Sequence, residues 1–244
     1  YRMKRLIPFL FLISLSTLTQ NLFAQSDELS YTEEFNYGVN FNTNGGMIGG
    51  LNFKWARAKG PRQFQSIGFE LVNVKHPKEY RLRSQETGNS FIGYKTHYLF
   101  SLRPFYGREF TILRKAAEEG VFVNLIVAGG PSLGIRKPYY ILYRESPQQD
   151  SPYASIPYTV DANLNQINGV GSFSDGLNNM NYTVGVHGKL GISFEFGQIK
   201  SSIAGLEVGI LAEKFSQTQN IVGLAPNSSF FSSAYILLYF GKKY

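Results

Sequence analysis

The residue types of this chain that could support nucleophilic catalysis are its three histidines and the polar residues that share their sequence pattern. His97 and His187 fall on the polar sides of alternating segments, whereas His76 precedes Pro77 in a polar stretch. The polar residues that share the alternation with the two histidines are Ser101, Ser193 and Glu195. A serine, a histidine and an acid can activate a hydroxyl, but only in a geometry that positions on separate segments do not supply. We therefore predict no catalytic residue.

The candidates for metal binding are Asp161 and Asp175, which lie among asparagines in a long polar stretch and could ligate Ca²⁺. Acids in a solvated loop are normally hydrated, however, and the sequence holds no H-E-x-x-H or EF-hand pattern and no cysteine. The glycine-rich stretch 169–176 lacks the preceding strand and following helix of a nucleotide-binding loop. We predict neither a metal nor a cofactor.

A cluster of basic residues surrounds Tyr80: Lys75, His76, Lys78, Arg81 and Arg83. Basic side chains at the rim of a membrane protein can bind the phosphates of lipopolysaccharide. The same composition is typical of a solvated loop, and Glu79 and Glu86 lower the net charge of this one. We favour the solvated loop and keep phosphate binding as the alternative.

The composition indicates the kind of element that positions these residues. The chain has 244 residues, of which 43% are hydrophobic and 15% aromatic, with a mean hydropathy of −0.16. This hydropathy is too low for a bundle of lipid-facing helices, whereas a barrel needs only every second residue to be apolar. Tyrosine and tryptophan are favoured where a protein surface meets both lipid and water.

The N-terminal segment has the pattern of a secretory signal. Lys4 and Arg5 precede an apolar core at 6–15, and the small residue Ala24 precedes Gln25. The apolar core is too short to span about 30 Å of hydrocarbon. We predict a cleavable signal peptide at 1–24, with cleavage between Ala24 and Gln25, and a single domain at 25–244.

That segment carries three of the 24 basic residues, which leaves 21 basic against 17 acidic residues in the rest of the chain. A small basic surplus spread over many strands does not predict nucleic-acid binding.

Strict alternation of apolar and polar residues predicts β-strands. The clearest case is 182–196, where Tyr182, Val184 and Val186 share a face with further apolar residues. This run exceeds the usual 5–6 residues of a soluble strand and reaches the roughly 9–11 residues of a tilted membrane strand. The other predicted strands are 35–41, 51–55, 67–71, 94–102, 121–135, 204–212 and 229–241, the last without an assigned inward face. The fold class is therefore all-β, an up-and-down antiparallel transmembrane β-barrel of about eight strands.

The connections alternate in length, as expected of such a barrel. Asn44-Gly45 predicts a tight hairpin with positive φ at both residues. Short turns are expected at 59–62 and 197–201, and long external loops at 75–90 and 145–180. The segment 102–121 predicts two long strands with a turn at 115–120. In this register Pro104 would mark a bend or bulge opposite the break at 129–131, because proline cannot donate to a ladder.

Charged residues on these strands should face the lumen, since an Arg or Lys on the lipid face costs roughly 2–4 kcal/mol near mid-membrane. The predicted lumen charge network is Lys54, Glu70, Lys95, His97, Arg103, Arg136, Lys189, Glu195, Glu207 and Glu213. An eight-stranded barrel is just wide enough for side chains to fill it. We favour a packed polar plug over the alternative, a path for protons or small solutes.

Three segments carry a resemblance to a known group: Phe23-Ala24-Gln25, the run 129–134 with Lys137-Pro138-Tyr139-Tyr140, and the aromatic C-terminus 239–244. In these the chain resembles small bacterial outer-membrane β-barrels of the OmpA/OmpX type, and more narrowly PorT-like or uncharacterised barrels of Bacteroidota. The resemblance implies insertion by the barrel-assembly machinery and transfers no active site.

The expected function is that of a non-enzymatic outer-membrane barrel, exported through its signal peptide. It would be a structural or accessory subunit, as in a secretion or assembly complex, in contact with outer-membrane lipid and other outer-membrane proteins. The alternatives are a narrow channel or surface receptor and, less favoured, a lipid-modifying enzyme.

Overall fold

The computed structural model describes residues 32–113, 121–144, 152–196 and 202–244. The predicted signal segment 1–24, with its cleavage site at Ala24 and Gln25, lies outside these residues, as do the predicted turns at 115–120 and 197–201.

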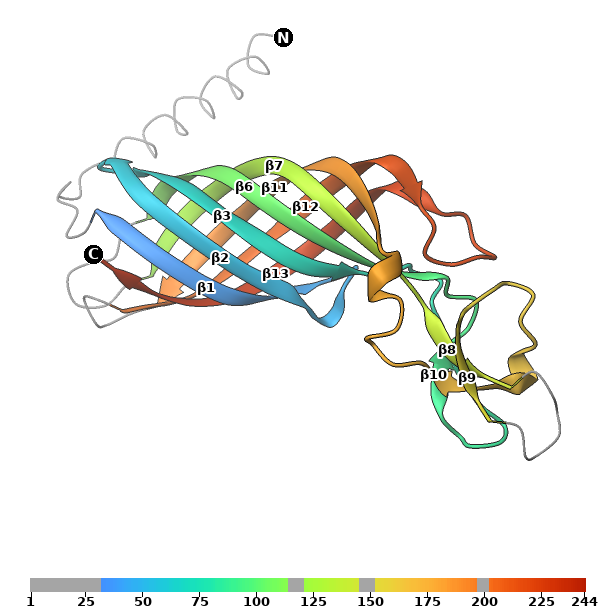
Figure 1. Cartoon of the computed structure of the whole chain (residues 1–244). Coiled ribbons are helices and arrows are strands. Elements are labelled where there is room, and N and C mark those ends of the chain that lie inside the picture. The colour runs from blue at the N-terminus through green and yellow to red at the C-terminus, as the bar shows by residue number, and fades with distance from the viewer. Residues whose placement is uncertain (1–31, 114–120, 145–151, 197–201) are drawn as a thin grey trace, which may run out of the picture.

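Eight long antiparallel strands close into a barrel in the order β1-β13-β12-β11-β7-β6-β3-β2 (Figure 1). Each strand pairs with its neighbours along the chain, and β1 closes the ring by pairing with β13. The prediction of an eight-stranded up-and-down barrel is confirmed. The strands are β1 (Glu33–Asn42), β2 (Gly46–Gly60), β3 (Gln63–Val74), β6 (His97–Leu113), β7 (Phe122–Pro138), β11 (Asn181–Phe196), β12 (Ser202–Gln219) and β13 (Ser228–Lys243).

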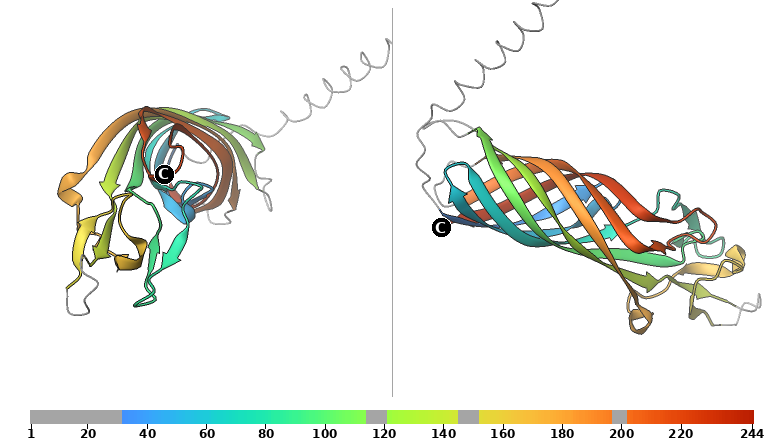
Figure 2. Two further views of the ribbon diagram at one scale, coloured as in Figure 1. Left: turned by 90° about the vertical axis from the view of Figure 1, so that its right-hand side faces the viewer. Right: turned by 90° about the horizontal axis from the view of Figure 1, so that it is seen from above.

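The start of β1 and the end of β13 lie at one end of the barrel, which we call the terminus end (Figure 1). At the opposite end, the loop end, a small folded extension hangs from one side of the ring (Figure 2). It contains the hairpin β4 (Arg81–Arg83) and β5 (Ser90–Ile92), and a sheet of β8 (Tyr140–Tyr143), β9 (Ala154–Pro157) and β10 (Ile167–Val170). Two short 3₁₀ helices, Leu164–Gln166 and Leu177–Asn179, complete it. The described parts of the segments predicted as long polar loops, 75–90 and 152–180, therefore contain short strands and 3₁₀ helices.

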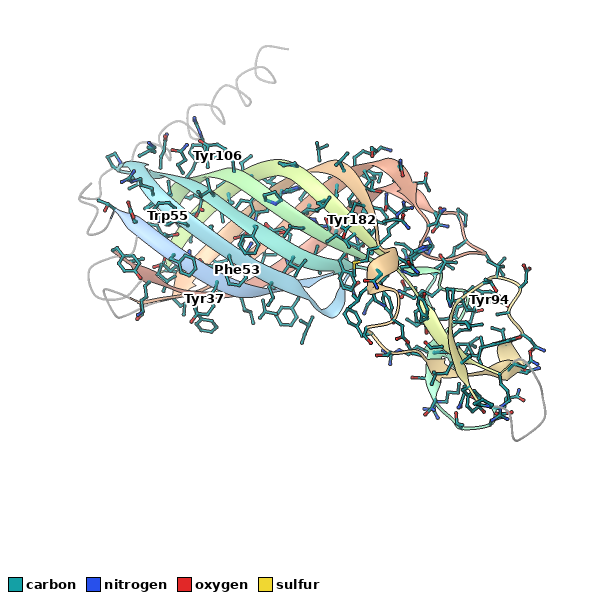
Figure 3. All side chains as sticks on the ribbon, viewed as in Figure 1. Tyr37, Phe53, Trp55, Tyr94, Tyr106 and Tyr182 are labelled. Carbon is teal, nitrogen blue, oxygen red and sulfur yellow. The ribbon has the colours of Figure 1, made fainter. Side chains whose placement is uncertain are left out.

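Alternate residues of every barrel strand face outward, and these are largely apolar. Trp55, Tyr106 and Tyr182 project from the wall (Figure 3), and Tyr182 is 64% exposed. The inward positions hold the polar residues that the alternation predicted, such as Lys189 and Glu207. The inward face of the last strand, β13, was not assigned from the sequence. In the structure Tyr235, Leu237 and the neighbouring odd-numbered residues of this strand face inward.

The first hairpin differs from the predicted primed turn. The N–H of Gly45 donates to the carbonyl of Asn42, and the positive φ falls on Gly46, at 84°, and not on Asn44 or Gly45. The side chain of Asn42 accepts from the N–H of Asn44 at 3.1 Å. This cap favours a three-residue loop followed by a left-handed glycine, which is another common hairpin connection.

Two prolines interrupt the ladder between β6 and β7. The register on both sides of the gap places Pro104 directly opposite Pro131, as the sequence predicted. The register does not shift across the gap, so the expected bulge is absent there. A Cβ on Gly130 would come within 2.2 Å of the Pro104 carbonyl oxygen, so the two strands approach closely at this point.

Candidate functional site

The loop end of the lumen is filled by an apolar cluster, which we call the stopper. It contains Val72, Leu99, Phe215 and Phe231 from the barrel strands together with Ile221 and Val222 from the loop between β12 and β13. That loop is fixed across the mouth, because Lys95 and Val222 form a β-bridge and the N–H of Gly223 donates to the carbonyl of Tyr94 at 2.8 Å. The mouth is thereby closed by side chains.

Below the stopper, Glu70 is the centre of a buried network. Its Oε1 lies 2.8 Å from the Lys189 Nζ and 3.1 Å from the Asn52 Nδ2, which both donate to it. Its Oε2 lies 3.9 Å from the Arg103 guanidinium. Lys189 also lies 3.5 Å from Glu207. Glu70 is 1% exposed, so the two cations neutralise a carboxylate that burial alone would make costly.

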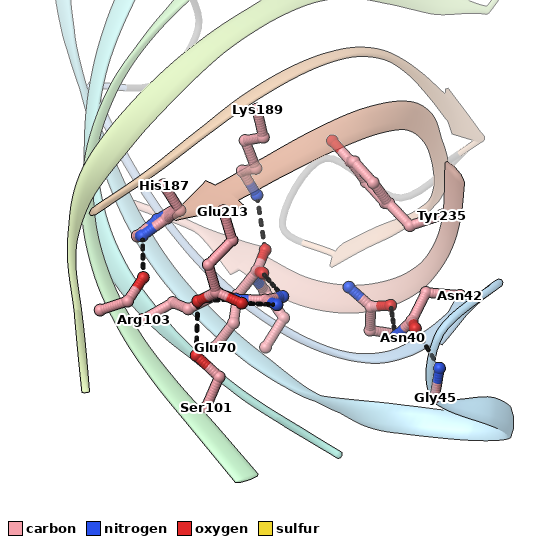
Figure 4. A network of polar contacts seen from close by, with 12 residues as sticks. Asn40, Asn42, Gly45, Glu70, Ser101, Arg103, His187, Lys189, Glu213 and Tyr235 are labelled. Atoms are coloured by element: carbon pink, nitrogen blue, oxygen red, sulfur yellow. Dashed lines mark hydrogen bonds and ion pairs between the residues drawn. The ribbon is translucent and has the colours of Figure 1, made fainter. Parts of the chain in front are cut away.

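Arg103 turns its other side to Glu213 (Figure 4). Its Nε and Nη2 donate to the two carboxylate oxygens at 2.9 and 2.6 Å, a bidentate pair that fixes both side chains. The hydroxyl of Ser101 donates to the same carboxylate at 2.6 Å. Glu70 of β3, Arg103 of β6 and Glu213 of β12 thus connect two adjacent strands of one wall to β12 across the lumen.

A second group of charges lies nearer the terminus end. The Lys54 Nζ donates to both oxygens of Glu109 at 2.8 and 2.9 Å and lies 3.7 Å from Glu34. Lys243 pairs with Glu195 close to the terminus-end rim. Apolar residues of β12 and β13 fill the space between these groups: Ile203, Leu211, Tyr235, Leu237 and Tyr239. The described lumen thus holds buried apolar and charged side chains at several levels between the stopper and the terminus end.

The structure places seven of the ten predicted network residues on the inward face of barrel strands, and all seven are buried: Lys54, Glu70, Arg103, Lys189, Glu195, Glu207 and Glu213. The other three lie elsewhere. Lys95 precedes β6 and pairs with Glu79 of the extension at 2.6 Å, and burial lowers the pKa of the Lys95 ammonium while Glu79 acts against that shift. His97 and Arg136 are half-buried at the loop-end rim and do not join the network.

Two carboxylates of the network, Glu34 and Glu109, were not predicted. Both follow from the alternation of their own strands, since Glu109 shares the parity of Arg103 and Glu34 that of Asn36. Glu109 lies beyond Pro104, in the part of the long predicted strand for which no inward face was assigned, and β6 continues through it.

Ser132 was also missed, although Gly130-Pro131-Ser132-Leu133-Gly134 has the spacing G-x-S-x-G. The Ser132 Oγ lies 3.0 Å from the His187 Nδ1. Glu213 lies near both side chains, so a serine, a histidine and an acid do meet in the lumen. In hydrolases this motif forms a sharp turn between a strand and a helix. Here it lies inside the continuous strand β7, and Ser132 is only 3% exposed.

The arrangement also differs from a working triad in its partners. The acid of a triad accepts from the histidine, but Glu213 accepts from Ser101 and Arg103. Among the described residues, the His187 Nε2 has no hydrogen-bond partner. The set considered from the sequence, the two histidines with Ser101, Ser193 and Glu195, does not come together. Ser101 bonds to Glu213, and Glu195 pairs with Lys243 at the far end.

The extension has a hydrophobic core of its own. Phe91, Tyr139, Ile141, Tyr158 and Ile167 are buried there, and the Tyr139 hydroxyl accepts from the N–H of Ile92 at 2.9 Å. Tyr94 packs against both this core and the stopper, with a φ of 55°. A tyrosine in the left-handed region is uncommon and is retained only where the surroundings fix it.

The basic cluster around Tyr80 lies at this end. The two acids that lower the net charge of this cluster contact residues outside it. Glu79 pairs with Lys95, and Glu86 contacts Arg144 and Tyr153. Within the described part of the chain, Lys78, Arg81 and Arg83 form no ion pair. Asp175 accepts from the N–H of Ser172, and no three His, Asp or Glu residues in the described ranges gather as metal ligands would.

Comparisons with known proteins leave the family unassigned. No family model matches the chain, and no curated protein sequence is significantly similar to it. Among solved structures it is similar to Ail, the attachment invasion locus protein of Yersinia pestis, crystallised with the heparin analogue sucrose octasulfate. The identity is 8% and the TM-score 0.40, over 87% of this chain and 97% of Ail. No helix in the described ranges is long and apolar enough to cross a membrane.

Proposed function

We propose that this chain is an integral protein of the bacterial outer membrane, exported through residues 1–24. The support is the outer wall of the barrel, where Val184, Val186 and Ile210 are each more than 60% exposed and belong to an apolar belt around the ring. A contiguous apolar surface of this size is unfavourable in water. The aromatic residues near both ends of the wall are typical of headgroup level (Figure 3).

Membrane fractionation tests this part of the proposal. The mature protein should sediment with outer membranes, need detergent to dissolve, and migrate faster on a gel before heating than after. A mature N-terminus at Gln25 is expected by N-terminal sequencing. A protein that stays in solution without detergent would refute the proposal.

We propose further that the barrel is a non-enzymatic, non-conducting structural or accessory subunit, as in a secretion or assembly complex. The observation that carries this is the closed lumen, in which the stopper and two charge networks occupy the path of a solute. The extension, with its own core at the loop end, is the part placed to contact a partner. The aromatic residue Phe240 in the last strand supports insertion by the barrel-assembly machinery.

Affinity isolation from detergent-solubilised membranes tests the accessory role. The full chain should come down with another outer-membrane protein, and a variant of the extension should lose that partner while the barrel stays folded. A barrel that is isolated alone under all mild detergents counts against this role.

The second candidate is a surface receptor or a narrow channel. The folded extension at the loop end favours the receptor, and no observation favours the channel. We expect no conductance from the reconstituted full chain in single-channel recording. The third candidate is a lipid-modifying enzyme, and the observation in its favour is the contact between Ser132 and His187. A change in the mass spectrum of lipid A caused by expression of the chain and abolished in Ser132→Ala would establish that candidate instead.

A further inference from the structure

A hollow of about 700 Å³ lies on the outer wall of the barrel over β7, β11, β12 and β13. Its floor is a row of small residues that the strand register places side by side. Gly129 pairs with Gly188, Gly188 with Ala212, and Ala212 with Ser232. The space above the row is open, because a Cβ added at Gly188 would meet no atom within 4 Å.

Larger residues border this row on both sides, so the hollow is a groove. Toward the loop end, the next outward residues beyond the lining of the hollow are Val186, Lys214 and Phe230, which pair in the same order. The wall toward the terminus end consists of Val127, Leu190 and Ile210, which also pair. Since neighbouring strands lie about 4.8 Å apart, a floor that crosses four strands is about 14 Å long.

The groove is polar at one end and apolar at the other. The β7 end, at Gly129 and Val127, lies within the apolar wall. The β13 end, at Ser232, reaches Thr43 in the turn between β1 and β2, whose N–H donates to the carbonyl of Ala234 at 3.0 Å. The groove therefore runs from the apolar wall to the loop-end rim.

A cation lies beside the polar end. The Lys214 side chain faces outward, and its ammonium donates to the Ser229 hydroxyl at 2.6 Å. Lys75 is held at the same turn, since its N–H donates to the carbonyl of Asn44 at 2.8 Å. An outward lysine is unfavourable in hydrocarbon but stable at headgroup level, where it can meet a phosphate.

We propose that this groove binds one phosphate-bearing lipid of the surrounding membrane. One acyl chain lies along the floor between Gly129 and Ser232, and the headgroup phosphate accepts hydrogen bonds from the Lys214 ammonium and the Thr43 hydroxyl. The proposal rests on the membrane insertion proposed above. Lipid is the favoured occupant because the groove has an apolar floor on the outer surface of the wall and a cation at the rim. An acyl chain fits the floor, and an anionic headgroup fits the cation.

Native mass spectrometry of the purified full chain tests this. The barrel in detergent is given dioleoylphosphatidylglycerol or, in a parallel sample, dioleoylphosphatidylcholine. Gly188→Leu fills the floor from outside, and Val184→Leu adds bulk to the outward face of the same strand beyond the groove. Lys214→Gln removes the rim cation, and Lys59→Gln removes an exposed cation at the terminus end as its control.

The wild-type barrel should retain one phosphatidylglycerol. Gly188→Leu should weaken retention of both lipids by about tenfold, because a displaced acyl chain loses the contacts of several methylenes. Lys214→Gln should weaken retention of phosphatidylglycerol by about fivefold, the effect of one lysine at a membrane surface. The two control variants should behave as wild type.

Several outcomes would overturn the proposal. Equal lipid retention in Gly188→Leu and Val184→Leu would place the lipid elsewhere. Displacement by inorganic phosphate would identify a phosphate site without a chain, and a dimer mass lost only in Gly188→Leu would make the groove a contact between two copies. Insertion is measured separately, by heat-dependent gel migration after refolding into phosphatidylcholine vesicles. A failure to insert refutes the membrane proposal and with it the lipid, whereas a barrel that inserts but retains no lipid refutes the groove alone.

Discussion

At the scale of single residues, the most demanding position in the barrel is Glu70, which two cations and an amide contact in the interior. Glu70→Ala would leave Lys189 and Arg103 partly unpaired at low exposure. We expect a loss of about 3–5 kcal/mol in the free energy of unfolding, since a buried cation without its partner cannot regain its hydration. Urea unfolding of the barrel in lipid vesicles measures this loss.

The matched control is the exposed pair formed by Arg57 and Glu33, 3.0 Å apart, with the arginine side chain 64% exposed. Arg57→Ala should change the unfolding free energy by less than about 1 kcal/mol, as for other surface pairs. Equal effects at the two positions would mean that the lumen is hydrated and that its charges are screened.

The sequence was most informative about which residues of each strand face the lumen, because inward and outward positions alternate. Seven predicted network residues are buried on barrel strands because each lies in an uninterrupted alternation. Lys95 lies elsewhere because it comes before the first residue of β6, at the mouth, where it bridges to Val222 and pairs with Glu79. The meeting of Ser132 with His187 depends on the lateral register of β7 and β11, which no local pattern in the sequence specifies.

At the scale of elements, the close approach of β6 and β7 depends on Gly130. Gly130→Ala would force the added Cβ to within 2.2 Å of the Pro104 carbonyl oxygen. We expect a loss of about 1–3 kcal/mol of stability, as for other cases of overpacking. Gly60→Ala is the control, because a Cβ there meets no atom within 4 Å. Thermal unfolding followed by gel migration compares the stability of the two variants. A Gly130→Ala barrel as stable as wild type would show that β6 and β7 can move apart at no cost in free energy.

The loop between β12 and β13, which contributes to the stopper, is also held from within by one side chain. The amide of Asn227 accepts from the N–H of Ile221 at 2.9 Å and donates to the carbonyl of Val222 at 2.8 Å. Asn227→Ala removes these bonds, and at about 0.5–1.5 kcal/mol each their loss should loosen the loop. We expect faster cleavage near 220–227 by a non-specific protease, with the barrel itself intact. Cleavage at the wild-type rate would mean that the bonds of Thr96 and Gly223 suffice to hold the loop.

The connections show the limit of sequence patterns at this scale. The long strands and the short turns follow from alternation and from glycine and proline. The strands β8, β9 and β10 have at most four residues each, too few for a period to be recognised. They pair with one another, and β10 also contacts β5 from a distant part of the chain. Their polar, glycine-rich surroundings therefore suggested loops.

At the scale of the whole molecule, the barrel and the extension have separate cores. Phe91 is 2% exposed in the extension core, and Phe91→Ala should cost about 3–5 kcal/mol locally. We expect trypsin to cleave the extension of this variant at its now accessible basic residues, while heat-dependent migration of the barrel is unchanged. Loss of that migration would mean that the two parts fold as one unit.

The interior of the barrel has more acids than bases. The carboxylates on its inward strand positions are Glu34, Glu70, Glu109, Glu195, Glu207 and Glu213, and the bases paired with them are Lys54, Arg103, Lys189 and Lys243. Rings of carboxylates favour the passage of cations over anions. If the stopper is loosened by Asn227→Ala, any current that appears should therefore be carried by K⁺ and not by Cl⁻. The sign of the reversal potential in a KCl gradient would show whether the excess of carboxylates over basic groups selects for cations.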